Sequence, residues 1–202
     1  MSQFEAEKTT EWLSGLTESV ELECKLAGGR DGKGALPKDF WETYSAFANT
    51  HGGVVLLGIK EKPKGRFSIE GVQQPGKVIG DLFNTLNNPS KVSVNLLQDS
   101  DVEVLDVHGK SVIQVTIPQA TRKQKPVFLG STPFSRNTYR RLHEGDRACD
   151  DETVKRMLAE QIEDDRDSKI LQGFGWDDID KQSLSVYRQM LKDAKPGHPF
   201  LE

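Results

Sequence analysis

The stretch "FWETYSAFANTHGGVVLLGI", residues 40–59, contains the pattern that decides the fold. Its first half repeats large apolar side chains at helical spacing, which predicts an amphipathic helix over 37–50. The "HGG" that follows is expected to end this helix, because glycine adopts the left-handed conformation common just after a helix. The apolar run 54–59 has the length of a strand and no alternation, so we predict a strand buried on both faces.

The segments around this stretch continue the mixture of helices and strands. Upstream, a short polar helix is expected over 3–14, and alternating apolar and polar residues predict a half-buried strand over 20–26. Downstream, we expect strand-like runs at 67–72, 92–97, 102–107 and 111–117, shorter runs at 126–129 and 137–142, and helices at 77–88, 151–165 and 182–193. This order predicts an α+β domain with a mixed, largely antiparallel sheet flanked by helices.

The composition describes a polar globular protein. Its 202 residues suffice for one domain with an appendage or for two small domains. No apolar run approaches the ~20 residues that a membrane span needs, and the start "MSQFEAEKTTEW" lacks the pattern of a secretory signal. The two cysteines, Cys24 and Cys149, form no CxxC pair, so neither a disulfide framework nor a zinc site is expected. We therefore expect a cytoplasmic protein without a membrane partner.

Charge is unevenly distributed along the chain, whose formal net charge is −4 at pH 7. Residues 150–180 hold eleven acids and four bases, a net of −7, which leaves +3 on the rest. Residues 122–147 hold seven bases and two acids, a local charge of +5. A mildly basic body with an acidic tail is compatible with phosphate contacts on one face, and a solvated surface explains the same charges.

Four motifs resemble those of the Schlafen-type AlbA-like domain. They are "ESVELECK" (18–25), "AFANTHGGVVLLGIKE" (46–61), "EGV" (70–72) and "TYRRLHEGDRACDDETV" (138–154). The resemblance implies that residues 1–165 form a nucleic-acid-binding domain with an AlbA-like fold. Bacterial members are often described as transcriptional regulators or as RecG-related helicase proteins. Residues 166–202 would then be an acidic linker and a helix that lead to a further C-terminal region.

Some Schlafen proteins cleave tRNA or rRNA with three carboxylates that hold a divalent metal. The resemblance therefore also implies this activity as an alternative for this chain. The matching positions are Glu18, Glu23 and Glu61, and Lys25 is the nearby cation that would stabilise negative charge on the phosphate. Glu61 stands where the family pattern has an aspartate. Binding alone needs no cofactor, whereas cleavage would need Mg²⁺ or Mn²⁺. On residue pattern alone, Glu21, Glu23 and Lys25 share one face of a strand, so surface ion pairs explain them as well.

Basic residues in three segments are candidate nucleic-acid contacts. They are Arg30 and Lys33 in a glycine-rich loop, Lys60, Lys62, Lys64 and Arg66 around a turn, and Arg136, Arg140 and Arg141 near a late strand. Cations grouped on a hairpin tip favour an anionic partner, because each neutralised phosphate releases counterions. Tyr139 among the arginines suits stacking on single strands.

We therefore predict a nucleic-acid-binding module, for RNA or DNA, of a larger regulatory or helicase-related protein. Two alternatives stay open: a metal-dependent endoribonuclease, and a protein-interaction or dimerisation domain. The sequence does not decide between RNA and DNA, and it leaves a homodimer open.

Overall fold

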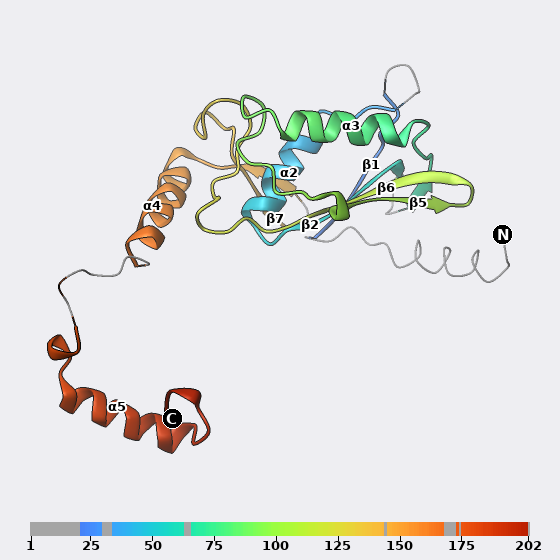
Figure 1. Cartoon of the computed structure of the whole chain (residues 1–202). Coiled ribbons are helices and arrows are strands. Elements are labelled where there is room, and N and C mark those ends of the chain that lie inside the picture. Colours follow the sequence, from blue (N-terminus) through green and yellow to red (C-terminus); the bar gives the residue numbers. More distant parts are fainter. Residues whose placement is uncertain are drawn as a thin grey trace. The chain divides into compact units, whose positions relative to one another are not determined.

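The computed structural model describes residues 21–29, 34–62, 66–143, 145–167, 173 and 175–201. The chain divides into two compact units, Met1–Asp165 and Arg166–Glu202 (Figure 1), and each is described by itself. No helix among the described residues is long and apolar enough to cross a membrane. The helix expected over 3–14 and the start of the strand expected over 20–26 lie outside these residues.

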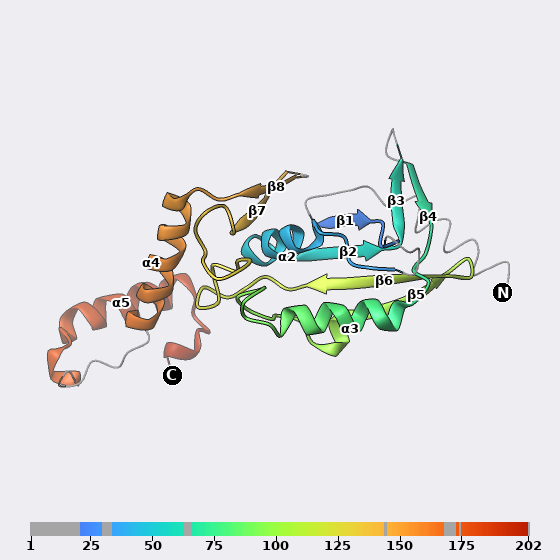
Figure 2. The same ribbon diagram turned by 90° about the horizontal axis from the view of Figure 1, so that it is seen from above.

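A four-stranded mixed sheet in the order β1–β2–β6–β5 forms the centre of the first unit (Figure 2). Its strands are β1 (Leu22–Lys25), β2 (Gly53–Leu57), β6 (Lys110–Ile117) and β5 (Val102–Val107). β1 and β2 are parallel, and the other two pairs are antiparallel. Two hairpins accompany the sheet: β3 (Ile59–Lys62) with β4 (Arg66–Ile69), and β7 (Tyr139–Leu142) with β8 (Gly145–Ala148). The α-helices among the described residues of this unit are α2 (Phe40–Asn49), α3 (Pro75–Leu86) and most of α4 (Asp151–Asp167). The predicted α+β class with a mixed sheet is confirmed.

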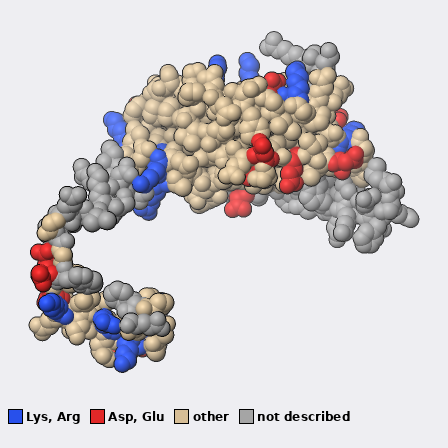
Figure 3. All heavy atoms as spheres, in the orientation of Figure 1, with Lys and Arg blue, Asp and Glu red and all other residues tan. Residues whose placement is uncertain are grey.

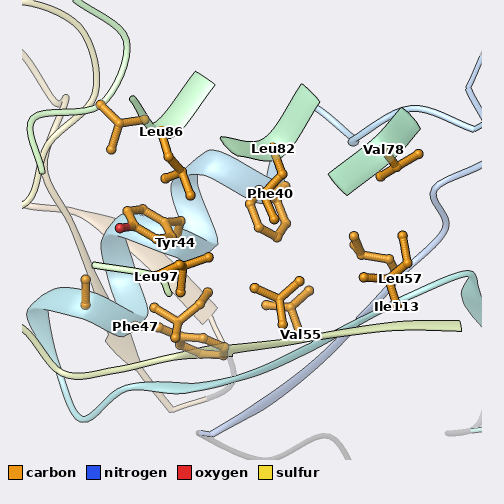
Figure 4. Packing of buried hydrophobic residues seen from close by; sticks show 14 of the residues in the cluster. Phe40, Tyr44, Phe47, Val55, Leu57, Val78, Leu82, Leu86, Leu97 and Ile113 are labelled. Carbon is orange, nitrogen blue, oxygen red and sulfur yellow. The ribbon is translucent and has the colours of Figure 1, made fainter. Parts of the chain in front are cut away.

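The larger core lies between the sheet and helices α2 and α3 (Figure 4). Phe40, Tyr44 and Phe47 of α2 are each fully buried, as the helical spacing in the sequence predicts. They meet residues of β2 and β6 on one side and the apolar stripe of α3 on the other, as Figure 4 shows. Burying a side chain of this size stabilises the fold by roughly 1.5–3 kcal/mol.

A second apolar cluster covers the opposite face of the sheet. It joins Cys24, Leu56, Val107 and Val112 of the sheet to Ile59, and the β4 residues Phe67 and Ile69 pack against it. Val55 and Leu57 of β2 belong to the larger core, whereas Leu56 belongs to this one. β2 is therefore buried on both faces, as predicted from its unbroken apolar run.

Gly58 divides the apolar run that the sequence suggested as one strand. Its φ of +96° is in the left-handed region, and a Cβ there would lie 3.0 Å from the carbonyl carbon of Gly71. The Gly58 amide donates to the oxygen of Lys25 at 2.9 Å. The chain thus leaves β2 at Leu57 and enters hairpin β3–β4, so the prediction of a continuous strand over 54–59 is wrong.

The run 92–97 is not a strand, which corrects a second prediction. Only Val92 takes part in a bridge, with Leu129. The backbone beyond it is satisfied by a side chain instead: the Tyr44 hydroxyl donates to the oxygen of Val94 at 3.0 Å and accepts from the amide of Leu96 at 2.8 Å. A pattern of apolar residues cannot distinguish this segment from a strand, because its apolar side chains pack against the core in either case.

The second unit contains helix α5 (Lys181–Ala194) and two short 3₁₀ turns, Trp176–Asp178 and Pro199–Leu201. Asp180 caps α5 by accepting from the amides of Gln182 and Ser183 at 3.1 and 3.2 Å. The Ser183 hydroxyl also donates to Asp180, and this hydrogen bond, followed by those of the two amides, lowers the pKa of Asp180. Asp180 thus fixes the start of α5, and the predicted span 182–193 agrees with the observed helix to within one residue at each end.

Candidate nucleic-acid interface

Glu23 and Lys25 of β1 point toward α2 and β7 and are largely withdrawn from water. The Lys25 ammonium lies 2.6 Å from Asp39 Oδ2, at the start of α2, and 3.3 Å from Glu23 Oε1. Only 8% of Lys25 is exposed. The other oxygen of Glu23 accepts from Arg141 Nη2 at 2.7 Å. Both oxygens of Glu23 are therefore already bonded to cations.

Arg141 extends this chain of charges to the β7–β8 hairpin. Its Nη1 donates to Asp146 Oδ1 at 3.0 Å, and its guanidinium carbon lies 5.1 Å from the centre of the Phe47 ring. Asp146 in turn accepts from the Thr43 hydroxyl at 2.6 Å. A run of alternating charges thus connects β1, the hairpin and α2, and the buried cation–π contact adds to it.

The two buried cations of this network stay charged. Burial lowers the pKa of Lys25, but the hydrogen bond to Asp39 and the charges of Glu23 and Asp39 outweigh it and raise the net pKa. Burial likewise lowers the pKa of Arg141, and its hydrogen bonds to Asp146 and Glu23 raise it further than burial lowers it. Paired in this way, the charges hold three elements together.

The "AFANT" stretch works alongside this network by bonding to backbone groups. Asn49 Nδ2 donates to the oxygens of Val127 and Tyr139 at 2.7 and 3.0 Å, and Asn49 Oδ1 accepts from the Val127 amide at 2.8 Å. The Thr50 hydroxyl accepts from the Arg141 amide at 2.9 Å. These side chains replace the sheet partners that β7 lacks on this side. Polar residues on the buried side of α2 are the sequence signal that could have revealed this role.

The three candidate metal-binding carboxylates are not brought together by the described residues. Glu18 lies outside them, and Glu61 is exposed on β3, where its Cα partner is Phe67. Glu23 sits between Lys25 and Arg141, so a metal would compete with two cations. Within the described ranges, no three His, Cys, Asp or Glu side chains are grouped to hold a metal ion. The described donors do not fit a divalent metal, and we derive no metal chemistry from them.

Two cations of the β3–β4 hairpin, Lys60 and Lys62, lie on exposed positions. Ile59, the first residue of β3, is buried in the second apolar cluster. Because side chains alternate along a strand, Lys60 and Lys62 share the face opposite to Ile59 and Glu61. Lys62 has Arg66 as its Cα partner. Lys64, Arg30 and Lys33, also expected to contact nucleic acid, lie outside the described residues.

The β7–β8 hairpin separates two neighbouring arginines. Arg141 is 3% exposed and held by Glu23 and Asp146, so it cannot reach a phosphate without breaking two ion pairs. Arg140 is on the other face, and its Cα partner is Arg147. Arg136 is exposed nearby. Figure 3 shows Lys and Arg side chains at the end of the unit from which α4 leaves, and acidic side chains along another part of this face.

The sequence of the first unit matches a known family. Residues 18–150 match the family model described as Schlafen, AlbA_2. The chain belongs to this family. The resemblance to the Schlafen-type AlbA-like domain, predicted from the sequence motifs, is thereby confirmed. Residues 155–202 match a second model, described as a domain of unknown function (DUF8451). No curated protein sequence matches the chain.

Solved structures include similar folds. One is the N-terminal domain of a Nitrosomonas europaea protein named "Putative ATP-dependent DNA Helicase RecG-related Protein". It is 29% identical, with a TM-score of 0.50, over 71% of this AlbA_2 chain and 92% of that domain. The DIP2311 protein from Corynebacterium diphtheriae is 16% identical, with a TM-score of 0.45. That match covers 97% of this chain but 41% of the Corynebacterium chain.

Proposed function

We propose that the first unit binds nucleic acid, RNA or DNA, through the cations of its two hairpins. One observation carries the proposal: each hairpin sets two basic residues directly opposite each other, Lys62 with Arg66 and Arg140 with Arg147. Like charges in directly opposite positions destabilise a strand pair. A polyanion bound at these pairs removes the repulsion and gains affinity from released counterions.

The arrangement of the hairpins supports the same function. Figure 2 shows β7–β8 and β3–β4 on the β1 side of the sheet, toward opposite ends of β1. Lys60 adds to the exposed face of the β3–β4 hairpin, and Arg136 lies just before β7. Family membership and the name of the Nitrosomonas protein agree with a domain that serves a nucleic-acid-associated or helicase-related protein.

The proposal covers binding and not cleavage. A metal-dependent nuclease of this type would need the Glu23 carboxylate as a ligand, yet both of its oxygens are bonded to Lys25 and Arg141. Freeing it would leave two buried cations each short of a partner, which is costly in a low-dielectric interior. Retention of bound nucleic acid requires no such rearrangement.

The test is a salt titration of binding, measured by fluorescence anisotropy with labelled single-stranded RNA, single-stranded DNA and duplex DNA. We expect binding that weakens linearly with the logarithm of salt, by about 0.7 per neutralised phosphate on single strands. Replacing both Lys60 and Lys62 by Gln should reduce that slope by about 1.4. The matched control replaces Lys77 and Lys91, exposed lysines elsewhere on the unit, by Gln.

Two results would overturn the proposal. One is the absence of binding to all three nucleic acids at low salt. The other is binding whose slope changes equally in the hairpin variant and in the control variant, since the hairpins would then have no special part in it.

A further inference from the structure

Strand β5 forms one edge of the central sheet. It is the last strand in the order β1–β2–β6–β5, and among the described strands it pairs only with β6. Glu103, Val104 and Asp106 are exposed on it, and Val104 is 47% exposed although its side chain is apolar. An exposed apolar residue between two exposed acids thus marks an edge that no described strand covers.

β5 turns a row of backbone donors and acceptors outward. Along an antiparallel pair, residues bonded to the partner strand alternate with residues whose N–H and C=O groups point away from it. Ser111 of β6 lies opposite Asp106, and its oxygen accepts from the Val72 amide at 2.8 Å, on the side away from β5. The amide and oxygen of Asp106 therefore point outward, as do those of Val104 two residues earlier. Among the described residues, none forms a hydrogen bond with these four groups.

The charges along β5 favour one kind of partner over two others. Residues 99–107 include no base and four acids, which are Asp99, Asp101, Glu103 and Asp106. Opposite charges on paired strands stabilise the pair, and like charges destabilise it. The acids therefore oppose pairing with a second copy of β5, and they repel nucleic acid. A basic extended segment meets complementary charge at the same edge.

We propose that β5 binds a basic extended segment of a partner protein, which adds to the sheet as an antiparallel strand. Hydrogen bonds to the outward groups of Val104 and Asp106 would hold the backbone of that segment. Its side chain opposite Val104 would be apolar, and those opposite Glu103 and Asp106 would be lysine or arginine. Asp106 keeps its charge for this contact while its Oδ1 accepts from the Gly109 amide at 2.8 Å.

This surface is separate from the cations proposed to bind nucleic acid. Both hairpins lie on the β1 side of the sheet, whereas β5 is the edge at the other end of the strand order (Figure 2). A domain with both surfaces would hold nucleic acid at one edge and a protein segment at the other. The two ligands would not compete, so each is tested without the other.

The probe is the peptide acetyl-Lys-Thr-Val-Lys-Val-amide, in which the two lysines would lie opposite Asp106 and Glu103, and the first valine opposite Val104. Its matched control is the same peptide N-methylated at the third and fifth residues, which keeps the charge but removes two donors that would face β5. Binding is followed by NMR on the backbone amides of the ¹⁵N-labelled protein. We expect saturable shifts centred on Val104 and Asp106 with the first peptide and none with the second.

Hydrogen exchange gives an independent measure of strand addition. In the free protein the outward amides of Val104 and Asp106 should exchange quickly, because no described group protects them. The amides of Glu103 and Leu105, which point toward β6, should exchange slowly. Saturating peptide should slow exchange at Val104 and Asp106 and leave the alternate amides as they were.

A charge reversal tests the choice of a basic partner. Glu103→Lys sets a cation opposite a lysine of the peptide, so we expect about fivefold weaker binding. The control is Glu61→Lys, on an exposed position of β3, which should bind the peptide like the wild type. The backbone amide spectrum of each variant shows whether it is folded, and the N-methylated peptide tests the proposal without any variant.

Three results would overturn the proposal. One is the absence of saturable shifts at Val104 and Asp106. Another is equal binding of both peptides, since charge attraction without strand addition would explain it. The third is slow exchange of the Val104 and Asp106 amides in the free protein that becomes slower with protein concentration, because a second copy would then occupy the edge.

Discussion

Replacing Glu23 by Gln should lower the free energy of unfolding of the first unit more than the same replacement of an exposed glutamate does. The change removes the charge between Lys25 and Arg141 while keeping the size of the side chain. Two contacts are affected, the 2.7 Å bond from Arg141 and the longer 3.3 Å contact with Lys25. A hydrogen bond to a charged group contributes about 1.5–3 kcal/mol, and the longer contact less.

The loss is limited because each cation keeps one acidic partner, Asp39 for Lys25 and Asp146 for Arg141. Removing one partner of a fully buried pair costs about 3–5 kcal/mol, and the carboxylate of Glu23 is partly exposed. We therefore expect Glu23→Gln to lower the free energy of unfolding by about 2–3 kcal/mol. With a urea dependence near 2 kcal/mol per molar, the midpoint should fall by about 1–1.5 M.

The assay is urea unfolding at pH 7, followed by circular dichroism. The control is Glu61→Gln, on an exposed position of β3, which should stay within about 0.5 kcal/mol of the wild type. Equal midpoints for the wild type and Glu23→Gln would refute the structural role of the network. Glu23 would then be a candidate metal ligand again, because the fold would not depend on its ion pairs.

Three further predictions concern other parts of the first unit. Asn49→Ala should lower the free energy of unfolding by about 3 kcal/mol, because Val127 and Tyr139 lose partners for buried backbone groups; urea unfolding measures it, and a loss below 1 kcal/mol would contradict the assigned contacts. Burial raises the pKa of Tyr44 to about 12, so its contribution to stability is complete below pH 10 and is lost as the pH rises toward 12. Stability should therefore fall less steeply across this range in Tyr44→Phe, and parallel pH profiles would argue against the shift. Structured RNA incubated with Mn²⁺ should remain intact, as it does with EDTA; metal-dependent cleavage that Glu23→Gln abolishes would show that Glu23 leaves its ion pairs.

The network changes how the family motifs are understood. Glu23, Lys25 and the buried side chains of "AFANT" belong to the stretches that carry the resemblance, and here they fasten β1 and β7–β8 to α2. Arg141, from the late arginine-containing motif, joins them. Motifs far apart in the sequence thus meet in one assembly, which positions the β7–β8 hairpin against β1 and α2.

Local patterns were sufficient for most of the fold. Spacing of apolar residues predicted α2, alternation predicted β1, and two separate apolar runs predicted β5 and β6, because each signal depends on neighbours within a few residues. The motifs were sufficient for the family, confirmed over residues 18–150. The sequence by itself therefore determined the class of the fold, most of its helices and strands, and the pool of basic residues.

Only the tertiary structure decided what the charged residues do. Arg140 and Arg141 are neighbours of the same type, yet the register of β7 with β8 buries one against Glu23 and leaves the other opposite Arg147. Likewise Glu23 and Lys25, predicted on an outer face, are covered by α2 and the hairpin. Burial and pairing depend on which distant segments pack together, a distinction that residue type and local spacing do not contain.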